Sequence, residues 1–363
     1  MKKNKNYVDL KDQPVPEGQH LLEVDDLKMY FHTEDGVVRA VDGVSYTLDR
    51  GETLGVVGES GSGKSVTAMT IMGLISMPPG KIEGGDVRYR GRSILEMTEE
   101  EMQHIRGNDI AMIFQDPMTS LNPVYKIGKQ VGEGLRLHRG YSKQEALKRA
   151  TELLDLVGIP EPEKRVNEYP HQFSGGMRQR VMIAMALACD PDILIADEPT
   201  TALDVTIQAQ IIELMQEMQE KNGNAIIMIT HDLGVVADMA DKIMVMYAGR
   251  PVEFGTAEEI FYESRHPYTW GLIRSIPEQA IDEKKPLTPI HGNPPSLMNL
   301  PEGCVFSPRC PYATDKCRKQ RPERVVTESG HYSACHYSGD PEFLKNAPET
   351  SRMRKDSKKG GEA

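Results

Sequence analysis

The chain has 363 residues, 39% of them hydrophobic, so it is long enough for one large domain and a smaller one. Its net charge of −11 argues against a protein whose main partner is nucleic acid. The longest unbroken apolar run, from Val181 to Cys189, is too short to span a bilayer, and no apolar run follows the first lysines. We therefore expect no signal peptide, and a soluble, cytosolic chain that meets a membrane only through a partner.

The N-terminal part predicts a loose arm followed by a small antiparallel sheet. Residues 1–19 are polar and contain two prolines, as in an arm with few fixed contacts. Three short alternating pieces then read as strands, with turns at Asp35-Gly36 and Asp42-Gly43. These pieces are Leu21–Met29, Val37–Val41 and Val44–Leu48.

Residues 58–65 read GESGSGKS and match G-x-x-x-x-G-K-[ST], the loop that cradles phosphates. The apolar stretch Thr53–Val57 before it reads as a buried strand and Val66–Leu74 after it as a helix, which is the context the motif requires. A glycine-rich loop turns backbone N–H groups toward an anion, and the helix adds its positive end. Lys64 would contact the β- and γ-phosphates and Ser65 would bind Mg²⁺. A chance glycine turn is the weaker alternative. The expected nucleotide-binding residues here are Gly58, Ser60, Gly61, Ser62, Gly63, Lys64, Ser65 and Val66.

The middle of the chain predicts a strand followed by a helical insert. Ile110–Phe114 reads as a strand that ends at Gln115. From about 117 to 188 the pattern is helical with polar linkers, most clearly over Lys143–Val157, where apolar residues recur at helical spacing.

Two later strands end in side chains suited to catalysis. The apolar strand 193–196 is followed by Asp197, suited to Mg²⁺, and Glu198, placed to polarise a water. Paired carboxylates after a strand are more often helix caps, but the P-loop upstream in an α/β chain favours the catalytic interpretation. Strand Ala225–Thr230 ends at His231, and open α/β sheets bind ligands at that end of a strand. A helix over Leu203–Lys221 and strands at Ile243–Tyr247 and Val252–Phe254 complete the predicted core.

Beyond about residue 264, prolines interrupt regular structure, and four of the five cysteines fall at 304, 310, 317 and 335. Five, six and seventeen residues separate them, whereas structural zinc sites favour pairs two to four apart. Four thiolates suit an iron–sulfur cluster equally well, and Pro311 after Cys310 matches the Cys-Pro of ferredoxins. Four unconnected thiols remain the weaker alternative, and His331 or His336 could replace one ligand. We expect a C-terminal domain over 265–339 and a disordered tail over 340–363.

Taken together, the motifs resemble those of the ATP-binding cassette (ABC) transporter ATPases over roughly Leu21 to Gly255. They are the P-loop, Gln115, Phe173-Ser174-Gly175-Gly176-Met177, the strand ending in Asp197-Glu198, Thr201-Ala202-Leu203-Asp204 and His231. The chain is similar in particular to the ATPase subunits of oligopeptide and dipeptide importers. That narrower resemblance depends on His266-Pro267-Tyr268-Thr269, on the segment 303–311 and on the C-terminal cysteines.

The resemblance implies a P-loop NTPase cassette over 20–264, with a RecA-like core, an antiparallel β subdomain and a helical insert. Phe31 takes the place of the adenine-stacking aromatic, with Tyr30 a one-residue alternative and core packing equally expected from sequence. Gln115 would touch Mg²⁺ and the attacking water, Glu198 would be the general base, and His231 would contact the γ-phosphate.

The resemblance also implies that two cassettes share two nucleotide sites. Ser174, Gly175 and Gly176 would cap the nucleotide of the opposite subunit, and Asp204 would lie at the dimer seam. The family signature usually begins with Leu and ends with Gln, where this chain has Phe173 and Met177. With residues 174–176 intact, we expect this difference to retune a half-site rather than disable it.

The implied function is ATP hydrolysis that powers import of oligopeptides or dipeptides. The implied partners are a second, related ABC ATPase, two transmembrane permeases and, indirectly, an extracytoplasmic peptide-binding protein, with this chain peripheral on the cytoplasmic face of the membrane. The alternatives are import of another solute such as nickel, or a non-transport ABC ATPase of DNA repair or translation. The resemblance also favours a [4Fe-4S] cluster over Zn²⁺ at Cys304, Cys310, Cys317 and Cys335.

Overall fold

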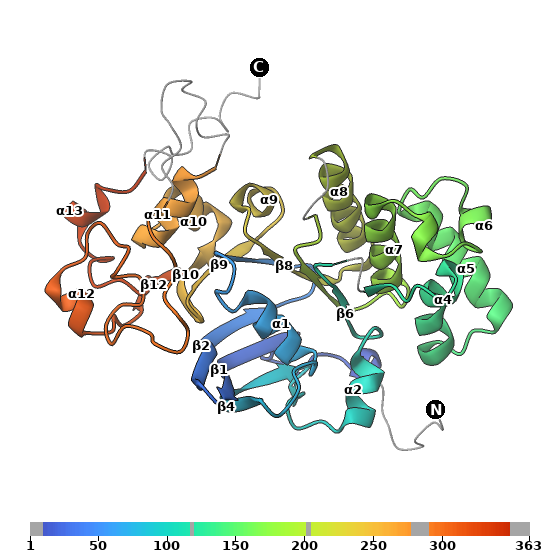
Figure 1. Cartoon of the computed structure of the whole chain (residues 1–363), viewed down its shortest axis with the longest axis horizontal. Helices are drawn as coiled ribbons and strands as arrows, with labels where there is room; N and C mark the ends of the chain where they lie inside the picture. Colours follow the sequence, from blue (N-terminus) through green and yellow to red (C-terminus); the bar gives the residue numbers. More distant parts are fainter. Residues whose placement is uncertain (1–9, 117–119, 201–204, 277–289, 349–363) are drawn as a thin grey trace.

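The computed structural model describes residues 10–116, 120–200, 205–276 and 290–348. Two sheets occupy the middle of the molecule, a group of helices lies on one side of them, and the C-terminal segment lies on the other (Figure 1). This arrangement confirms the predicted α/β fold with an antiparallel subdomain and a helical insert. In the described part of the chain, no helix combines the length and the apolar character needed to cross a bilayer.

The smaller sheet is antiparallel and comes from the N-terminal part of the chain. Its strands, in spatial order, are β2 Gly36–Leu48, β1 Leu22–Thr33, β4 Gly80–Tyr89 and β5 Arg92–Ser93. The turn predicted at Asp42-Gly43 is wrong, because β2 continues through it. Leu27 pairs with Val44 and Lys28 with Asp42, so Gly43, at φ 90°, is the extra residue of a β-bulge. Strand β4 has no counterpart among the predicted strands.

The larger sheet has a parallel centre with antiparallel strands added at one side. Its order is β11 Val325–Val326, β12 Tyr332–Ser333, β10 Arg250–Thr256, β9 Lys242–Tyr247, β3 Thr53–Val57, β8 Ala225–Thr230, β7 Ile193–Asp197 and β6 Ile110–Ile113. The strands β3, β8, β7 and β6 are buried along their whole length, as expected for parallel strands covered on both faces. Strand β3 lies between β8 and β9, so the loop that follows it opens where the strand order reverses.

Helices flank the large sheet and form the insert. Helix α5 matches the predicted helix, and a capping box at its start, between Ser142 and Glu145, explains where it begins. The insert contains α4 Ile127–His138, α5 Lys143–Leu156, α6 Pro162–Arg165, η2 Pro170–Gln172 and α7 Gly175–Leu187. The other helices of the sheet region are α1 Lys64–Ile71, α2 Glu99–Ile105, α8 Val205–Asn222, α9 Leu233–Ala237 and α10 Ala257–Tyr262.

The C-terminal segment, with α11 Pro267–Arg274, α12 Asp315–Lys319 and α13 Pro341–Leu344, is continuous with the large sheet. Its strand β12 pairs with β10, and the fully buried carboxylate of Glu253 on β10 accepts the backbone N–H of His266 at 3.2 Å. Nε2 of His331 lies 3.1 Å from the same carboxylate. These contacts join the predicted 265–339 region to the cassette.

Both chain ends contain more fixed structure than the sequence predicts. Leu10 is buried, and Nζ of Lys11 donates to the carbonyl oxygen of Cys189 at 3.1 Å, so the loose-arm prediction is wrong for the short η1 helix, Leu10–Asp12. The disordered-tail prediction is wrong for 340–348, because α13 places Phe343 against Trp270, with ring centroids 5.3 Å apart. The rest of the predicted tail lies outside the described residues.

Candidate nucleotide site at the ends of the parallel strands

The P-loop bridges β3 and α1 in a backbone conformation that two glycines make accessible. Gly58 has φ 151° and Gly63 has φ 101°, both in the region that side chains rarely adopt. A Cβ at Gly58 would lie 2.2 Å from the carbonyl oxygen of Met246, and one at Gly63 would lie 2.3 Å from that of Ala40. The loop therefore packs directly on neighbouring backbone, and α1 begins at Lys64 with its N-terminus facing the loop.

Lys64, the residue of the P-loop at which α1 begins, is buried. Its Nζ donates to the carbonyl oxygens of Gly58 at 2.6 Å and Glu59 at 3.1 Å. Burial lowers the pKa of Lys64, and the carboxylates of Glu198 and Asp197 act in the opposite direction. A buried ammonium group held by two carbonyls can exchange them for phosphate oxygens, which are stronger, charged acceptors.

Ser65 and Asp197 meet beside the loop. Oγ of Ser65 donates to Oδ1 of Asp197 at 3.0 Å, which joins the first turn of α1 to the end of β7. Burial is the main influence that raises the pKa of Asp197, and the neighbouring carboxylate of Glu198 raises it further. A divalent cation would stabilise the ionised form, and a hydroxyl oxygen with a carboxylate oxygen is a donor set that Mg²⁺ accepts. The residues present therefore fit the expected magnesium site.

The three predicted catalytic side chains converge at the ends of β6, β7 and β8. Nε2 of Gln115 donates to Oε2 of Glu198 at 2.9 Å, and Nδ1 of His231 lies 3.3 Å from Oε1 of the same residue. Glu198 itself has φ 48°, a conformation that costs on the order of 1 kcal/mol and persists only where the surroundings fix it. Its N–H donates to the carbonyl of Ile229 at 2.9 Å, which supplies part of that restraint.

The signature segment lies on the surface of the insert. Oγ of Ser174 caps α7 by accepting the N–H of Met177 at 3.3 Å, and Ser174 and Gly175 are exposed. Phe173, which stands where the family signature usually has Leu, is buried in the hydrophobic core that includes the helical insert. Arg178 donates to the carbonyl of Pro170 at 2.8 Å, so it stabilises the turn before the signature. None of the hydrogen bonds found for Ser174 among the described residues reaches the P-loop of its own chain.

For the other residues predicted to contact the nucleotide, the structure gives a location where it describes them. Phe31 is half-buried on β1 and packs against the core, while the hydroxyl of Tyr30 donates to Oδ1 of Asp42 at 2.9 Å. Burial, with the nearby Asp42 carboxylate, raises the pKa of Tyr30. Ser60 and Gly61 are exposed in the P-loop, and Val66 lies in α1. Asp204 lies outside the described residues.

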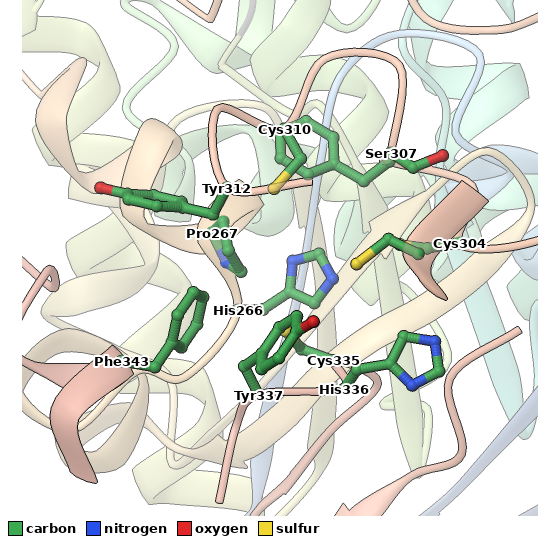
Figure 2. A pocket seen from close by; sticks show the side chains of 12 residues that line it. His266, Pro267, Cys304, Ser307, Cys310, Tyr312, Cys335, His336, Tyr337 and Phe343 are labelled. Atoms are coloured by element: carbon green, nitrogen blue, oxygen red, sulfur yellow. The ribbon is translucent and has the colours of Figure 1, made fainter. Parts of the chain in front are cut away.

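The four C-terminal cysteines line one cavity together with His266, Phe306 and Tyr312. In Figure 2 the sulfurs of Cys304 and Cys310 point toward the shared space above His266. Within the described ranges, no three His, Cys, Asp or Glu side chains are arranged so that they could hold one metal ion. The geometry of the described residues therefore supports neither the predicted [4Fe-4S] cluster nor the zinc alternative.

Burial shapes the chemistry of these thiols. It raises the pKa of Cys304, that of Cys310 to about 11 and that of Cys335 to about 12. The two histidines offered as substitute ligands have other partners: His331 contacts Glu253, and Nε2 of His336 lies 2.9 Å from the carbonyl oxygen of Gln320.

One set of contacts at the P-loop is not predicted, because it joins residues that lie far apart in the sequence. The guanidinium of Arg309 contacts the carboxylate of Glu59 through two nitrogens, and the N–H of Glu59 donates to the hydroxyl of Tyr268 at 2.9 Å. Tyr268 and Arg309 both lie in the segments on which the resemblance to peptide-importer ATPases depends.

Comparison with known proteins assigns the family. The family described as "ABC transporter" matches residues 41–201, and "Oligopeptide/dipeptide transporter, C-terminal region" matches residues 252–317. The oligopeptide transport ATP-binding protein OppD of Bacillus subtilis (strain 168) is 58% identical over 312 residues, which are 86% of this chain and 87% of that protein. The dipeptide transport ATP-binding protein DppD of Escherichia coli (strain K12) is 52% identical over 320 residues, 88% of this chain and 97% of that protein.

Solved structures agree with this assignment. A dimeric ATP-binding cassette in a post-hydrolysis state, bound to ADP and Pi, matches with a TM-score of 0.59 at 29% identity, over 65% of this chain and 98% of that one. The matched region has the cassette fold, and the relatives extend the similarity into the C-terminal segment. The chain belongs to the ATP-binding cassette ATPases of the oligopeptide and dipeptide transporter family.

Proposed function

We propose that this chain is the subunit that binds and hydrolyses ATP to power the import of oligopeptides or dipeptides through partner permeases. The observation that carries the proposal is the convergence of Gln115, Glu198 and His231 beside the Ser65–Asp197 pair, at the mouth of a P-loop. The peptide substrate is inferred from the C-terminal family region and from the relatives named above.

We assign each side chain a role from its position or from the family resemblance. Lys64 and the P-loop amides would hold the β- and γ-phosphates, and Ser65 and Asp197 would hold Mg²⁺, which would offset charge on the phosphates. Glu198 accepts a proton from the attacking water, and Gln115 and His231 fix its carboxylate. Gln115 would also contact Mg²⁺ and the attacking water, and His231 the γ-phosphate. Phe31 supports the adenine ring, with Tyr30 as the neighbouring alternative.

The partners proposed for this chain follow from surfaces as well as from the family. The signature at Ser174–Gly176, in which Ser174 and Gly175 are exposed, can meet a nucleotide held by a second, related cassette, with Asp204 at the seam between them. Val124 and Tyr125, just after Gln115 in the insert, are exposed large apolar side chains suited to a membrane subunit. We place the chain on the cytoplasmic face of the membrane, bound to two permeases and served by an extracytoplasmic peptide-binding protein, with no nucleic-acid partner.

The purified chain alone should be a poor ATPase, because Lys64 and Ser174 are expected to serve different nucleotides. Turnover should rise when the partner cassette and permeases are added. A Ser174→Arg variant should block this rise by placing a bulky cation where the signature must approach phosphate, whereas Ser142→Ala, at the cap of α5, should leave it intact. Full, concentration-independent activity from a monomer would contradict the shared-site proposal.

The transported solute is tested separately from ATPase activity. Affinity purification from detergent-solubilised membranes should recover permeases, and vesicles containing the recovered complex and its binding protein should accumulate labelled peptide when ATP is present. Accumulation of Ni²⁺ instead of peptide would establish the alternative solute, and recovery of nucleic acid without permeases would establish a non-transport ATPase.

We also propose that Cys304, Cys310, Cys317 and Cys335 bind one metal centre, a [4Fe-4S] cluster. All four line the same cavity, and a cluster spreads its four cysteine ligands over separate iron corners. Zn²⁺, which draws four sulfurs to about 2.3 Å from one point, is the alternative metal. Such a centre would tie together the parts of the C-terminal segment that carry the four cysteines.

Anaerobic purification should yield iron and acid-labile sulfide at the stoichiometry of one cluster per chain, with broad absorbance in the visible blue. Changing Cys310 to Ser should remove that absorbance, because one ligand is lost, whereas Cys189→Ser, outside the cavity, should keep it. One zinc per chain would establish the rival metal, and no metal in the anaerobic protein would overturn both.

A further inference from the structure

Glu59, the second residue of the P-loop, has all three of its polar groups engaged. Its carbonyl oxygen accepts from Nζ of Lys64 at 3.1 Å, and its N–H donates to the hydroxyl of Tyr268 at 2.9 Å. Its two carboxylate oxygens accept from Arg309, with Nη1 to Oε2 at 2.5 Å and Nη2 to Oε1 at 3.0 Å. The carbonyl oxygen thus holds Lys64, which is expected to bind the nucleotide. The N–H and the carboxylate are held by Tyr268 and Arg309 of the C-terminal segment.

Arg309 is held in place before it reaches Glu59. Only 4% of its side chain is exposed, and its Nε and Nη2 donate to the carbonyl oxygens of His291 and Ile290 at 3.0 and 3.2 Å. Nη1 also lies 3.3 Å from the hydroxyl of Tyr247 at the end of β9. A planar guanidinium fixed on several sides presents a rigid two-pronged contact to a carboxylate.

Tyr268 is equally restrained. It is fully buried at the start of α11, and its ring packs on Tyr247 and Phe306 with centroid distances of 4.6 and 5.4 Å. The hydroxyl therefore meets the N–H of Glu59 from a fixed position. Between them, Tyr268 and Arg309 define where this part of the glycine-rich loop lies.

We infer that Arg309, assisted by Tyr268, is a positioning residue for the nucleotide site, through which the C-terminal segment sets the affinity of the P-loop for ATP. The loop contains glycines at 58, 61 and 63, so it depends on outside contacts to hold one conformation. Fixing Glu59 fixes a carbonyl that orients Lys64 and the neighbouring amides that receive the phosphates. The inference rests on the proposed ATP site and does not require the metal centre.

The test measures binding of a fluorescent ATP analogue to the full chain, with thermal melting recorded in parallel. Arg309→Met should weaken binding on the order of 10-fold, a typical coupling between linked sites. Arg309→Lys should recover part of the loss, because a single ammonium replaces the charge but not the two-pronged contact. Arg318→Met is the matched control, since this surface arginine of the same segment pairs only with exposed Asp315 in the described contacts and should leave binding unchanged.

Glu59→Gln provides an independent variant should Arg309→Met prove unfolded. It removes the same ion pair from the P-loop side with little change of shape and should reproduce the weaker binding. The double variant should be no weaker than either single one, because both remove one interaction. In the assembled transporter, KM for ATP should rise while kcat at saturating ATP stays near that of the parent.

Parent-like affinity in a folded Arg309→Met or Glu59→Gln variant would overturn the inference, as would equal losses in Arg318→Met. Additive losses in the double variant would also overturn it, since the two residues would then act separately. If the parent chain itself did not bind the ATP analogue, the proposed nucleotide site would fail instead, so the two failures are distinguishable.

Discussion

Replacing Lys64 with alanine should abolish tight ATP binding. Its ammonium group is buried between the carbonyls of Gly58 and Glu59 and is the side-chain cation that the P-loop offers to the β- and γ-phosphates. Hydrogen bonds to charged groups contribute about 1.5 to 3 kcal/mol each, so losing the bonds to both phosphates should weaken affinity about a hundredfold or more. Titration with a fluorescent ATP analogue measures the effect.

The control for this variant is Lys81→Ala. Lys81 is exposed on β4 and pairs with Glu83, so its removal changes the net charge equally without touching the loop. It should bind the analogue as the parent does. Lys64→Ala binding ATP as tightly as the parent would show that the phosphates bind elsewhere.

Replacing Glu198 with glutamine should preserve ATP binding and slow hydrolysis. Glutamine keeps the shape that Gln115 and His231 contact, but it cannot accept a proton from water. Loss of a general base typically lowers the rate by about 10²–10⁴-fold. The ATP-bound pair of cassettes should then persist, because hydrolysis no longer separates the two halves.

Turnover is best measured in a complex whose other half-site has been inactivated, so that one site is observed. Size-exclusion chromatography with ATP should show the trapped pair. Glu152→Gln, on the exposed face of α5, serves as the charge-matched control and should hydrolyse ATP normally. Near-normal turnover by Glu198→Gln under these conditions would remove Glu198 from the role of base.

Much of the core of the fold could be predicted because its signals are local. Strands β3 and β8 are short apolar runs buried on both faces, and their observed bounds coincide with the predicted ones. Gln115, Glu198 and His231 lie far apart in sequence, yet each follows a parallel strand. Since parallel strands end at the same edge of a sheet, where ligands bind, the three side chains could be predicted to lie close together.

The remaining features depend on contacts that no local pattern encodes. Asp42-Gly43 has the composition of a turn, but pairing with β1 makes it a bulge within a long strand. Helix α13 is only four residues long and is fixed by the packing of Phe343 on three rings from earlier segments. The Arg309–Glu59 contact joins residues 250 positions apart, so only the folded chain reveals it.

The strands at one edge of the large sheet also affect how readily another chain could pair with it. Beyond the seven residues of β10, the C-terminal segment adds β12 and then β11, each of two residues. So short an outer strand offers almost no unpaired backbone on which another chain could build, which is how natural sheets avoid joining edge to edge. A bare cassette cut after β10 would present that longer strand to its neighbours. The C-terminal segment therefore covers β10 at Glu253 and Phe254 and leaves a two-residue strand outermost, which is a poorer template for edge-to-edge pairing.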